Sequence, residues 1–210
     1  MTRHAHAERL AMADLMAEQG PAAPTLCGEW TVRDLAAHII LRERRPDAAG
    51  GIVLKRLAGY AERVQREIAA HDFPDLLRQL RNPPWWSPIS NPLLDEQVNL
   101  AEMFVHHEDV RRAQPGWEPR DLSQDLQREL WTQARRRCAL VLRRFRAVIH
   151  VEAPGFGAAR GGAGGPDTLR LSGAPGELLI FLYGRQAHCH TIIDGPSALA
   201  EKLRRARLGI

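Results

Sequence analysis

Two histidines and one glutamate occur at a spacing that could hold a divalent metal ion. Glu102 and His106 are four residues apart, so a helix would place both side chains on the same face, one turn apart. His38 lies between Leu35 and Leu41 in another segment with helical spacing of apolar residues, at the border of its apolar face. Two imidazoles and one carboxylate leave coordination positions open, as catalytic zinc sites require, and they also suit nickel, iron or manganese.

The segment that carries Glu102 has a second histidine directly after His106. With about 100° of rotation per residue, Glu102 and His106 flank the apolar stripe of this helix, whereas His107 points about 180° away from its centre. The stripe consists of Leu94, Val98, Ala101 and Val105. We therefore expect His106, and not His107, to face the other helices, and Asp109 could orient an imidazole there. Two alternatives stay open, because this spacing also occurs in surface ion pairs and a histidine at an apolar border is commonly a hydrogen-bonded core residue.

Helix and turn signals predict an antiparallel helical bundle for the N-terminal part of the chain. Thr31 with Asp34 three residues later has the pattern of a capping box, and Asn91-Pro92 supplies the N-cap and the first position of the helix with Glu102. Residues 74–80 are predicted as a short turn, and the proline- and tryptophan-rich residues 81–92 as a loop. The predicted helices cover residues 3–19, 31–45, 52–70, 91–113 and 122–145.

After residue 145 the pattern changes to alternating strands and helices. We predict strands at 147–154, 168–173 and 188–194, helices at 174–185 and 196–208, and a floppy glycine-rich connector at 154–167. The glycines of the connector match neither the dinucleotide-binding nor the P-loop pattern. The expected fold is therefore α+β, with a helical bundle over residues 1–145, including a fifth helix at 122–145, and a small α+β domain over residues 146–210.

Composition narrows the classes of partner. The three cysteines, Cys27, Cys138 and Cys189, are odd in number and far apart, which argues against a disulfide framework or a thiolate zinc site. The formal charge is +4, and apolar residues at helical spacing interrupt the densest basic segment, residues 135–146. This pattern is typical of a solvated helix face rather than of a nucleic-acid interface. No apolar run approaches the roughly 20 residues that span a bilayer, and the N-terminus lacks a signal-peptide pattern, so we expect a cytoplasmic protein without a membrane partner.

Three strings in the chain resemble one protein family. TLCGEWTVRDLAAH (residues 25–38) and EMFVHHEDVRR (residues 102–112) look like the DinB-like superfamily, and within it like the actinobacterial mycothiol-dependent maleylpyruvate isomerase family and its metal-binding relatives. GAPGELLIFLYGR (residues 173–185) resembles the second, sterol-carrier-like domain of that family. The resemblance covers most of the chain. It implies a DinB-like four-helix bundle followed by a small sterol-carrier-like α+β domain.

The resemblance also implies a metal-dependent activity. Members of this branch bind a divalent metal, typically zinc, through a His-Glu-His set that corresponds to His38, Glu102 and His106. Arg185 corresponds to an arginine near the active cleft of the isomerase, where it would neutralise a carboxylate or a developing enolate. The implied activity is that of an S-transferase or isomerase in which the metal activates mycothiol, a low-molecular-weight thiol, toward an electrophilic substrate.

Several assignments stay open at the level of the sequence. The glycine-rich connector and residues 43–52 depart from the isomerase, so we do not carry over maleylpyruvate as the substrate. A non-catalytic metal or small-molecule binding protein, and a hydrolase that uses metal-bound water, are the alternative functions, and a homodimer is compatible with either. Five further candidates have simpler interpretations. Cys27 is expected to be a buried thiol, and Trp85 and Trp86 to belong to a loop lid. His188 and His190 are expected to be exposed histidines of a strand.

Overall fold

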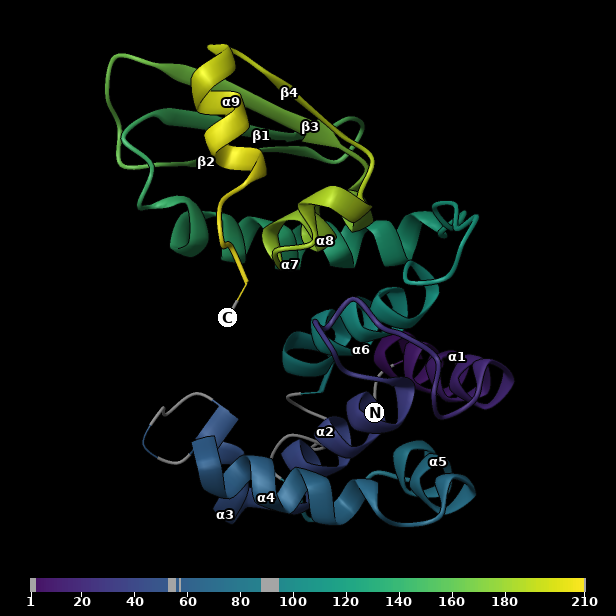
Figure 1. Cartoon of the computed structure of the whole chain (residues 1–210). Helices are drawn as coiled ribbons and strands as arrows, with labels where there is room; N and C mark the ends of the chain where they lie inside the picture. Colours follow the sequence, from purple (N-terminus) through teal and green to yellow (C-terminus); the bar gives the residue numbers. More distant parts are fainter. Residues whose placement is uncertain (1–2, 53–55, 57, 88–94, 210) are drawn as a thin grey trace. The chain divides into compact units, whose positions relative to one another are not determined.

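The computed structural model describes residues 3–52, 56, 58–87 and 95–209 (Figure 1). The chain divides into two compact units, Met1–Trp117 and Glu118–Ile210, and we describe each by itself. The sequence predicts the boundary near residue 145, where the strands begin. The observed division falls earlier because the long helix α7 (Gln124–Leu142) packs against β2 (Gly157–Gly161) and α8 (Pro175–Leu182) of the second unit.

The first unit is built from helices. They are α1 (Arg3–Gln19), α2 (Val32–Arg44), α3 (Pro46–Ala49), η1 (Gly50–Ile52), α4 (Ala58–Ala69), α5 (Phe73–Arg81) and α6 (Asp95–Arg111). The bounds of α1 agree with the prediction. The predicted capping box of α2 is confirmed, since the backbone N–H of Thr31 donates to Asp34 Oδ2 at 2.9 Å and the N–H of Asp34 donates back to Thr31 Oγ1 at 3.4 Å. The predicted start of α6 at Asn91-Pro92 lies outside the described residues, as does most of 53–57.

The turn predicted at residues 74–80 is wrong, because these residues lie within α5. Pro74 occupies the first turn of this helix, where a backbone N–H would have no partner inside the helix. Leu76, Leu77 and Leu80 are buried on one side of α5. Their helical spacing was the signal in the sequence, and the proline marks the start of the helix rather than a turn.

Helix α2 is the centre of the first unit because both of its sides are buried. Leu35 and Ile39 pack in a cluster with residues of α1, α5 and α6, whereas Ile40 and Leu41 pack in a second cluster with residues of α4. A buried ion pair between Arg9 of α1 and Glu43 of α2 adds a polar contact between these helices. The first cluster contains side chains of both α2 and α6, the two helices that carry the predicted metal ligands.

The second unit contains a mixed four-stranded sheet in the order β2-β1-β3-β4 (Figure 1). Its other strands are β1 (Val148–Ala153), β3 (Thr168–Gly173) and β4 (Thr191–Asp194), and β1 and β3 are parallel while the other pairs are antiparallel. Helices α7 and α8 pack on the sheet, and α9 (Ser197–Arg204) packs on β4. No helix in the described parts of the chain is both long and apolar enough to cross a membrane.

Two predictions about the second unit need correction. The segment predicted as a glycine-rich connector contains β2, which pairs with β1 from Ala153↔Gly157 to Ile149↔Gly161. Backbone hydrogen bonds to a neighbouring strand can form without bulky side chains, so the poor side-chain pattern hid this strand. His188 and His190, which were predicted as exposed strand residues, do not lie in a strand. His188 ends the short helix η4 (Gln186–His188), and β4 begins after His190, whose N–H donates to Glu177 Oε2 at 2.7 Å.

Candidate metal centre

Helix α6 is buried over almost its whole described surface. Between Asn99 and Val110 every side chain except that of Glu102 is buried. The prediction that only His106 faces other helices is therefore wrong, because His107 is also buried. His107 Nδ1 lies 2.8 Å from Glu8 Oε2 on α1, about 100° around the axis of α6 from His106. Leu94 and the side chain of Val98, which belong to the predicted stripe, lie outside the described residues.

The loop between α1 and α2 brings Cys27 to α6. The backbone N–H of Leu26 donates to the carbonyl oxygen of Asp109 at 3.0 Å, which attaches the loop to α6. Thr25 Oγ1 accepts from the N–H of Cys27 at 3.2 Å and donates to the carbonyl oxygen of Trp30 at 2.7 Å. Gly28 follows with φ +67°, a conformation that glycine adopts at no steric cost, so the chain can turn directly after the cysteine.

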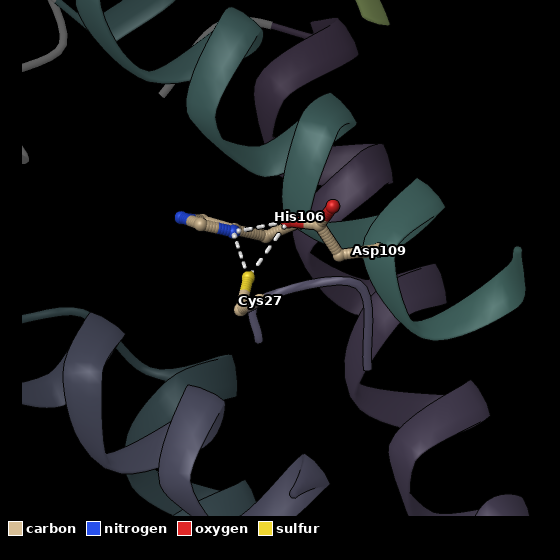
Figure 2. A group of neighbouring side chains, drawn as sticks. All are labelled: Cys27, His106 and Asp109. Carbon is tan, nitrogen blue, oxygen red and sulfur yellow. Dashed lines mark hydrogen bonds and ion pairs between the residues drawn. The ribbon is translucent and has the colours of Figure 1, made fainter. Parts of the chain in front are cut away.

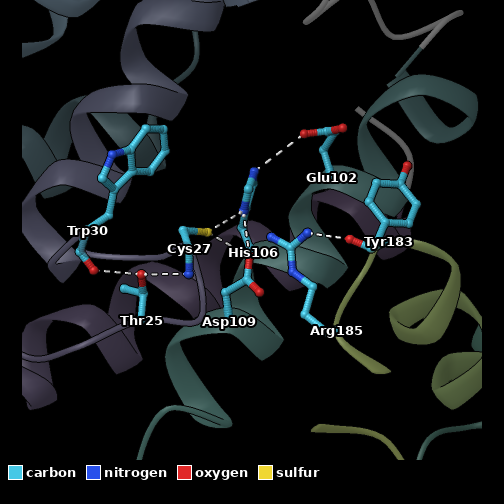
Figure 3. A network of polar contacts seen from close by, with 8 residues as sticks. All are labelled: Thr25, Cys27, Trp30, Glu102, His106, Asp109, Tyr183 and Arg185. Carbon is cyan, nitrogen blue, oxygen red and sulfur yellow. Dashed lines mark hydrogen bonds and ion pairs between the residues drawn. The ribbon is translucent and has the colours of Figure 1, made fainter. Parts of the chain in front are cut away.

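The imidazole of His106 has an acidic partner on each of its nitrogens (Figure 3). Nδ1 lies 3.0 Å from Asp109 Oδ2, and Nε2 lies 3.4 Å from Glu102 Oε2. The predicted contact of Asp109 with an imidazole is thus present, and its role in orienting that ring stays a prediction. Such a partner fixes the ring and increases its basicity as a metal ligand.

On the Nδ1 side, His106, Asp109 and Cys27 form a compact group (Figure 2). The Cys27 thiol donates to Asp109 Oδ2 at 3.0 Å, and its sulfur lies 3.9 Å from His106 Nδ1. Among the described residues, this is the group whose ligand atoms all lie within 4.8 Å of one another, so it could hold a metal ion. The two 3.0 Å separations are hydrogen-bond distances, and ligands on a tetrahedral zinc ion would be about 3.4–3.6 Å apart.

Glu102 lies on the Nε2 side of His106 and His38 lies nearby on α2, but the ligand atoms of these three residues do not all lie within 4.8 Å of one another. The 3.4 Å between Nε2 and Glu102 Oε2 equals the separation of about 3.4 Å expected for nitrogen and oxygen ligands on one tetrahedral zinc ion. The His38 ring on α2 has its centroid 5.6 Å from that of His106, with the rings 77° apart. Two imidazoles that share a zinc ion have centroids about 5 Å apart. The ring of Trp30 also packs on His38, with the two centroids 5.0 Å apart.

Burial and neighbouring charges set different protonation states for the two histidines. Burial is the main cause that lowers the pKa of His38 to about 4, and the positive charge of His106 adds to it. His38 is therefore neutral at pH 7, the form that binds a metal. Burial also lowers the pKa of His106, but the hydrogen bonds with Asp109, Cys27 and Glu102 outweigh it and raise the pKa well above its usual value. Burial raises the pKa of Glu102, yet the contact with His106 dominates and lowers it to about 2.

The structure places the other predicted residues as follows. Arg185 belongs to the second unit, where its Nη1 donates to the carbonyl oxygen of Tyr183 at 2.6 Å, and its role near a metal stays a prediction. Trp85 and Trp86 are exposed after the end of α5. Cys189 donates to the carbonyl oxygen of Gln186 at 3.3 Å.

Two further polar residues of the centre were missed by the sequence analysis. Arg42 lies one turn after His38 on α2, and its Nη1 donates to Asn99 Oδ1 on α6 at 2.9 Å. Asn99 lies three residues before Glu102 and is fully buried. The spacing of four residues between His38 and Arg42 was a signal in the sequence, because it places both side chains on one helix face.

We found no match to this chain among protein-family models, curated proteins or solved structures. The assignment of function therefore depends on the geometry of the centre and on the resemblance of the three strings described above.

Proposed function

We propose that this protein binds one divalent metal ion, preferably zinc, through His38, Glu102 and His106 Nε2. The observation that carries the proposal is the position of the His106 ring, with Asp109 at Nδ1 and Glu102 at Nε2. A ring held in this way presents Nε2 toward the glutamate, and the ring of His38 lies nearby. The proposal includes the DinB-like bundle that the motif strings imply for the first unit.

The donor set fits a divalent metal. One neutral imidazole, one ionised carboxylate and one imidazole oriented by a buried aspartate are ligands that zinc, nickel, iron and manganese accept. Depression of the pKa of His38 and of Glu102 keeps both groups in their ligating forms at neutral pH. Only His106 must release a proton, and Asp109 remains as acceptor for its Nδ1–H.

We propose further that the centre serves a thiol-dependent transferase or isomerase, with mycothiol as the thiol that the resemblance implies. A bound divalent ion would lower the pKa of a thiol that ligates it and so supply a thiolate at neutral pH. The residues of this chain hold the ligands in place. Asp109 fixes the ring of His106, and Trp30 packs on His38, restricting its rotation.

A second candidate places the ion on the other side of His106. The ligand atoms of this group, which are those of Cys27, His106 Nδ1 and Asp109, already lie within 4.8 Å of one another. The set includes a thiolate and favours zinc over harder ions. It leaves His38 and Glu102 without a direct role. Both candidates share His106, so the two can be separated only by the residues on either side of the ring.

The decisive experiment measures metal content in matched variants. The protein is loaded with zinc, dialysed and analysed for metal, alongside His38→Ala, Glu102→Ala and Cys27→Ala. The first candidate predicts about one zinc per chain in the unsubstituted protein and in Cys27→Ala, and strong loss in the other two variants. The second candidate predicts loss in Cys27→Ala alone. Circular dichroism confirms that each variant is folded.

Cobalt provides an independent readout of the ligand set. The cobalt-loaded protein should lack the intense near-ultraviolet thiolate-to-cobalt absorption under the first candidate and show it under the second. A protein that takes up neither metal would refute both. Metal uptake without any turnover of thiols and electrophiles would leave a metal-binding protein and reject the transferase or isomerase.

A further inference from the structure

The second unit carries the positive charge of the chain. Residues 118–210 include 15 arginines and lysines against 9 aspartates and glutamates, whereas residues 1–117 include 14 against 16. The formal net charge is therefore +6 in the second unit and −2 in the first. Such a difference in charge between two parts of one chain is a general indication of a polyanionic partner.

Helix α7 and the turn directly after it expose two pairs of arginines. The first pair is Arg135 with Arg136, and the second pair is Arg143 with Arg144. No aspartate or glutamate occurs between Glu129 and Glu152, so no acidic residue lies one helical turn away from any of the four. Arg128, near the start of the same helix, instead has an ion pair of 2.7 Å with Asp125. The positive charge is thus concentrated at the C-terminal end of α7.

The apolar residues among these arginines lie mainly on the other side of the helix. Cys138 and Leu142 are fully buried, and both lie so close to Gly161 of β2 that a side chain there would touch them. In the sequence, such interruptions favoured a solvated face; in the structure they dock α7 on the sheet and leave the arginines outside. Ala139 and Leu140 stay exposed between the two pairs.

The spacing of the two pairs matches the groove of a nucleic-acid duplex. Arg143 keeps helical backbone angles, so it lies eight residues, or about 12 Å along the helix axis, from Arg135. The major groove of B-form DNA is about 12 Å wide and admits an α-helix. A guanidinium can also donate two parallel hydrogen bonds to one phosphate group. Each pair could therefore reach the phosphates of one wall of the groove.

Two other polyanionic partners fit this face less well. A helix that lies on an anionic membrane inserts a stripe of large apolar side chains. Leu140 is the one such side chain exposed along α7, every residue of which the structure describes. Single-stranded nucleic acids bind by stacking their bases on aromatic side chains. The one aromatic residue of α7, Trp131, is buried.

We infer that the exposed face of α7 binds the phosphate backbone of a nucleic-acid duplex through its two arginine pairs. The binding does not depend on base sequence, because Ala139 and Leu140, which lie between the pairs, have no polar side-chain group for the base edges. This activity is independent of the proposed metal centre, whose ligands all belong to the first unit.

The test follows the fluorescence anisotropy of a labelled DNA duplex of about 20 base pairs as the full chain is added, at about 50 and 200 mM salt. Two double variants remove one arginine pair each, R135Q/R136Q and R143Q/R144Q. The matched control is R204Q/R205Q, which removes the same charge from α9, where both arginines are exposed and pair with Glu201. Circular dichroism checks the fold of every variant.

Four phosphate contacts predict that the logarithm of the affinity falls with the logarithm of salt concentration at a slope of about −3.6, which is a loss of roughly 150-fold between the two salt concentrations. Each double variant on α7 should reduce this slope to about −1.8 and weaken binding at least about tenfold at the lower salt concentration. The control on α9 should stay close to the unsubstituted protein. A single strand of the same length should bind more weakly than the duplex.

Equal weakening by the α9 control and the α7 variants would show that net charge attracts the DNA, and would overturn the inference. Absence of duplex binding at the lower salt concentration, or tighter binding of the single strand, would overturn it too. Vesicles of phosphatidylglycerol and phosphatidylcholine test the membrane alternative. Vesicle binding that is lost in R143Q/R144Q, by a protein that does not bind the duplex, would assign this face to a membrane surface instead.

Discussion

His106 and His107 are neighbours in the sequence, are both buried, and both contact a carboxylate, yet they lie in different surroundings. His107 meets Glu8 of α1 through one nitrogen, in a contact that joins two helices. His106 meets acidic groups through both nitrogens, with a second imidazole and a thiol close by. The difference shows that burial and pairing do not distinguish a candidate ligand from a structural histidine. The number of potential ligands that converge on the ring does.

Substitution of each histidine gives the largest expected effects. His106→Ala should reduce bound zinc from about one per chain to near zero, because either candidate metal position uses this ring. His107→Ala should keep the zinc and lower the free energy of unfolding by about 1–3 kcal/mol, since Glu8 loses a buried partner. Metal analysis and urea denaturation measure the two effects. Loss of zinc in His107→Ala with an intact fold would contradict the structural role assigned to His107.

Substitution of the carboxylate that contacts each histidine should change zinc binding less than loss of His106 does. Asp109→Asn should weaken zinc affinity by about 10- to 100-fold without changing the stoichiometry, if the aspartate only orients His106. The matched change Glu8→Gln should leave zinc affinity unchanged. Competition with a chromophoric chelator measures both affinities. Complete loss of zinc in Asp109→Asn would instead support direct ligation by Asp109.

Proton release offers a measure of the His106 environment. The raised pKa of His106 means that its metal-free ring carries an additional proton at pH 7, and metal binding must displace it. We expect release of about one proton per zinc at pH 7, and an apparent affinity that falls about tenfold for each unit of pH below the pKa of the metal-free ring. His38 adds no release at this pH, because its pKa of about 4 leaves it neutral.

Calorimetry in two buffers with different heats of ionisation counts the released protons. In Asp109→Asn the number should fall, since the loss of the negative partner lowers the pKa of His106. His107→Ala should not change it. Zinc binding without proton release in the unsubstituted protein would show that the His106 ring is neutral before binding.

The smallest expected effect concerns the thiol on the His106 side of α6. Cys27 is partly buried, whereas Cys138 is fully buried and its pKa is raised to about 11 by burial. At pH 8 about one in a thousand Cys138 thiols would be ionised, so iodoacetamide should modify Cys27 before Cys138. Mass spectrometry of peptides measures this order. Zinc should slow the modification of Cys27 severalfold at most if the ion lies on the Nε2 side, and abolish it if Cys27 is a ligand.

Local signals predicted much of the fold. The apolar spacing of α1, the capping box at Thr31 and the alternation in β3 depend on neighbouring residues, which any reader of the sequence can inspect. The prediction for β2 was wrong because this strand depends on its partner strand, whereas that for α5 was wrong because Pro74 was taken as a turn signal although the leucine spacing was helical. Three leucines of α5 pack into the core, and β2 exists through its ladder with β1. Similarly, α7 was assigned to the bundle because its sequence is helical, although its packing partners lie in the second unit.

The sequence by itself determined which groups are available for chemistry: a Glu-x-x-x-His pair on one helix, a histidine on another, and an aspartate one turn after the pair. It did so because helical periodicity fixes which side chains share a face. Only the tertiary structure decided that Cys27 and Asp109 meet at one nitrogen of His106, that Arg42 and Asn99 meet beside His38, and that His107 is buried against α1. These contacts join segments far apart in the chain, and their geometry depends on how whole helices pack.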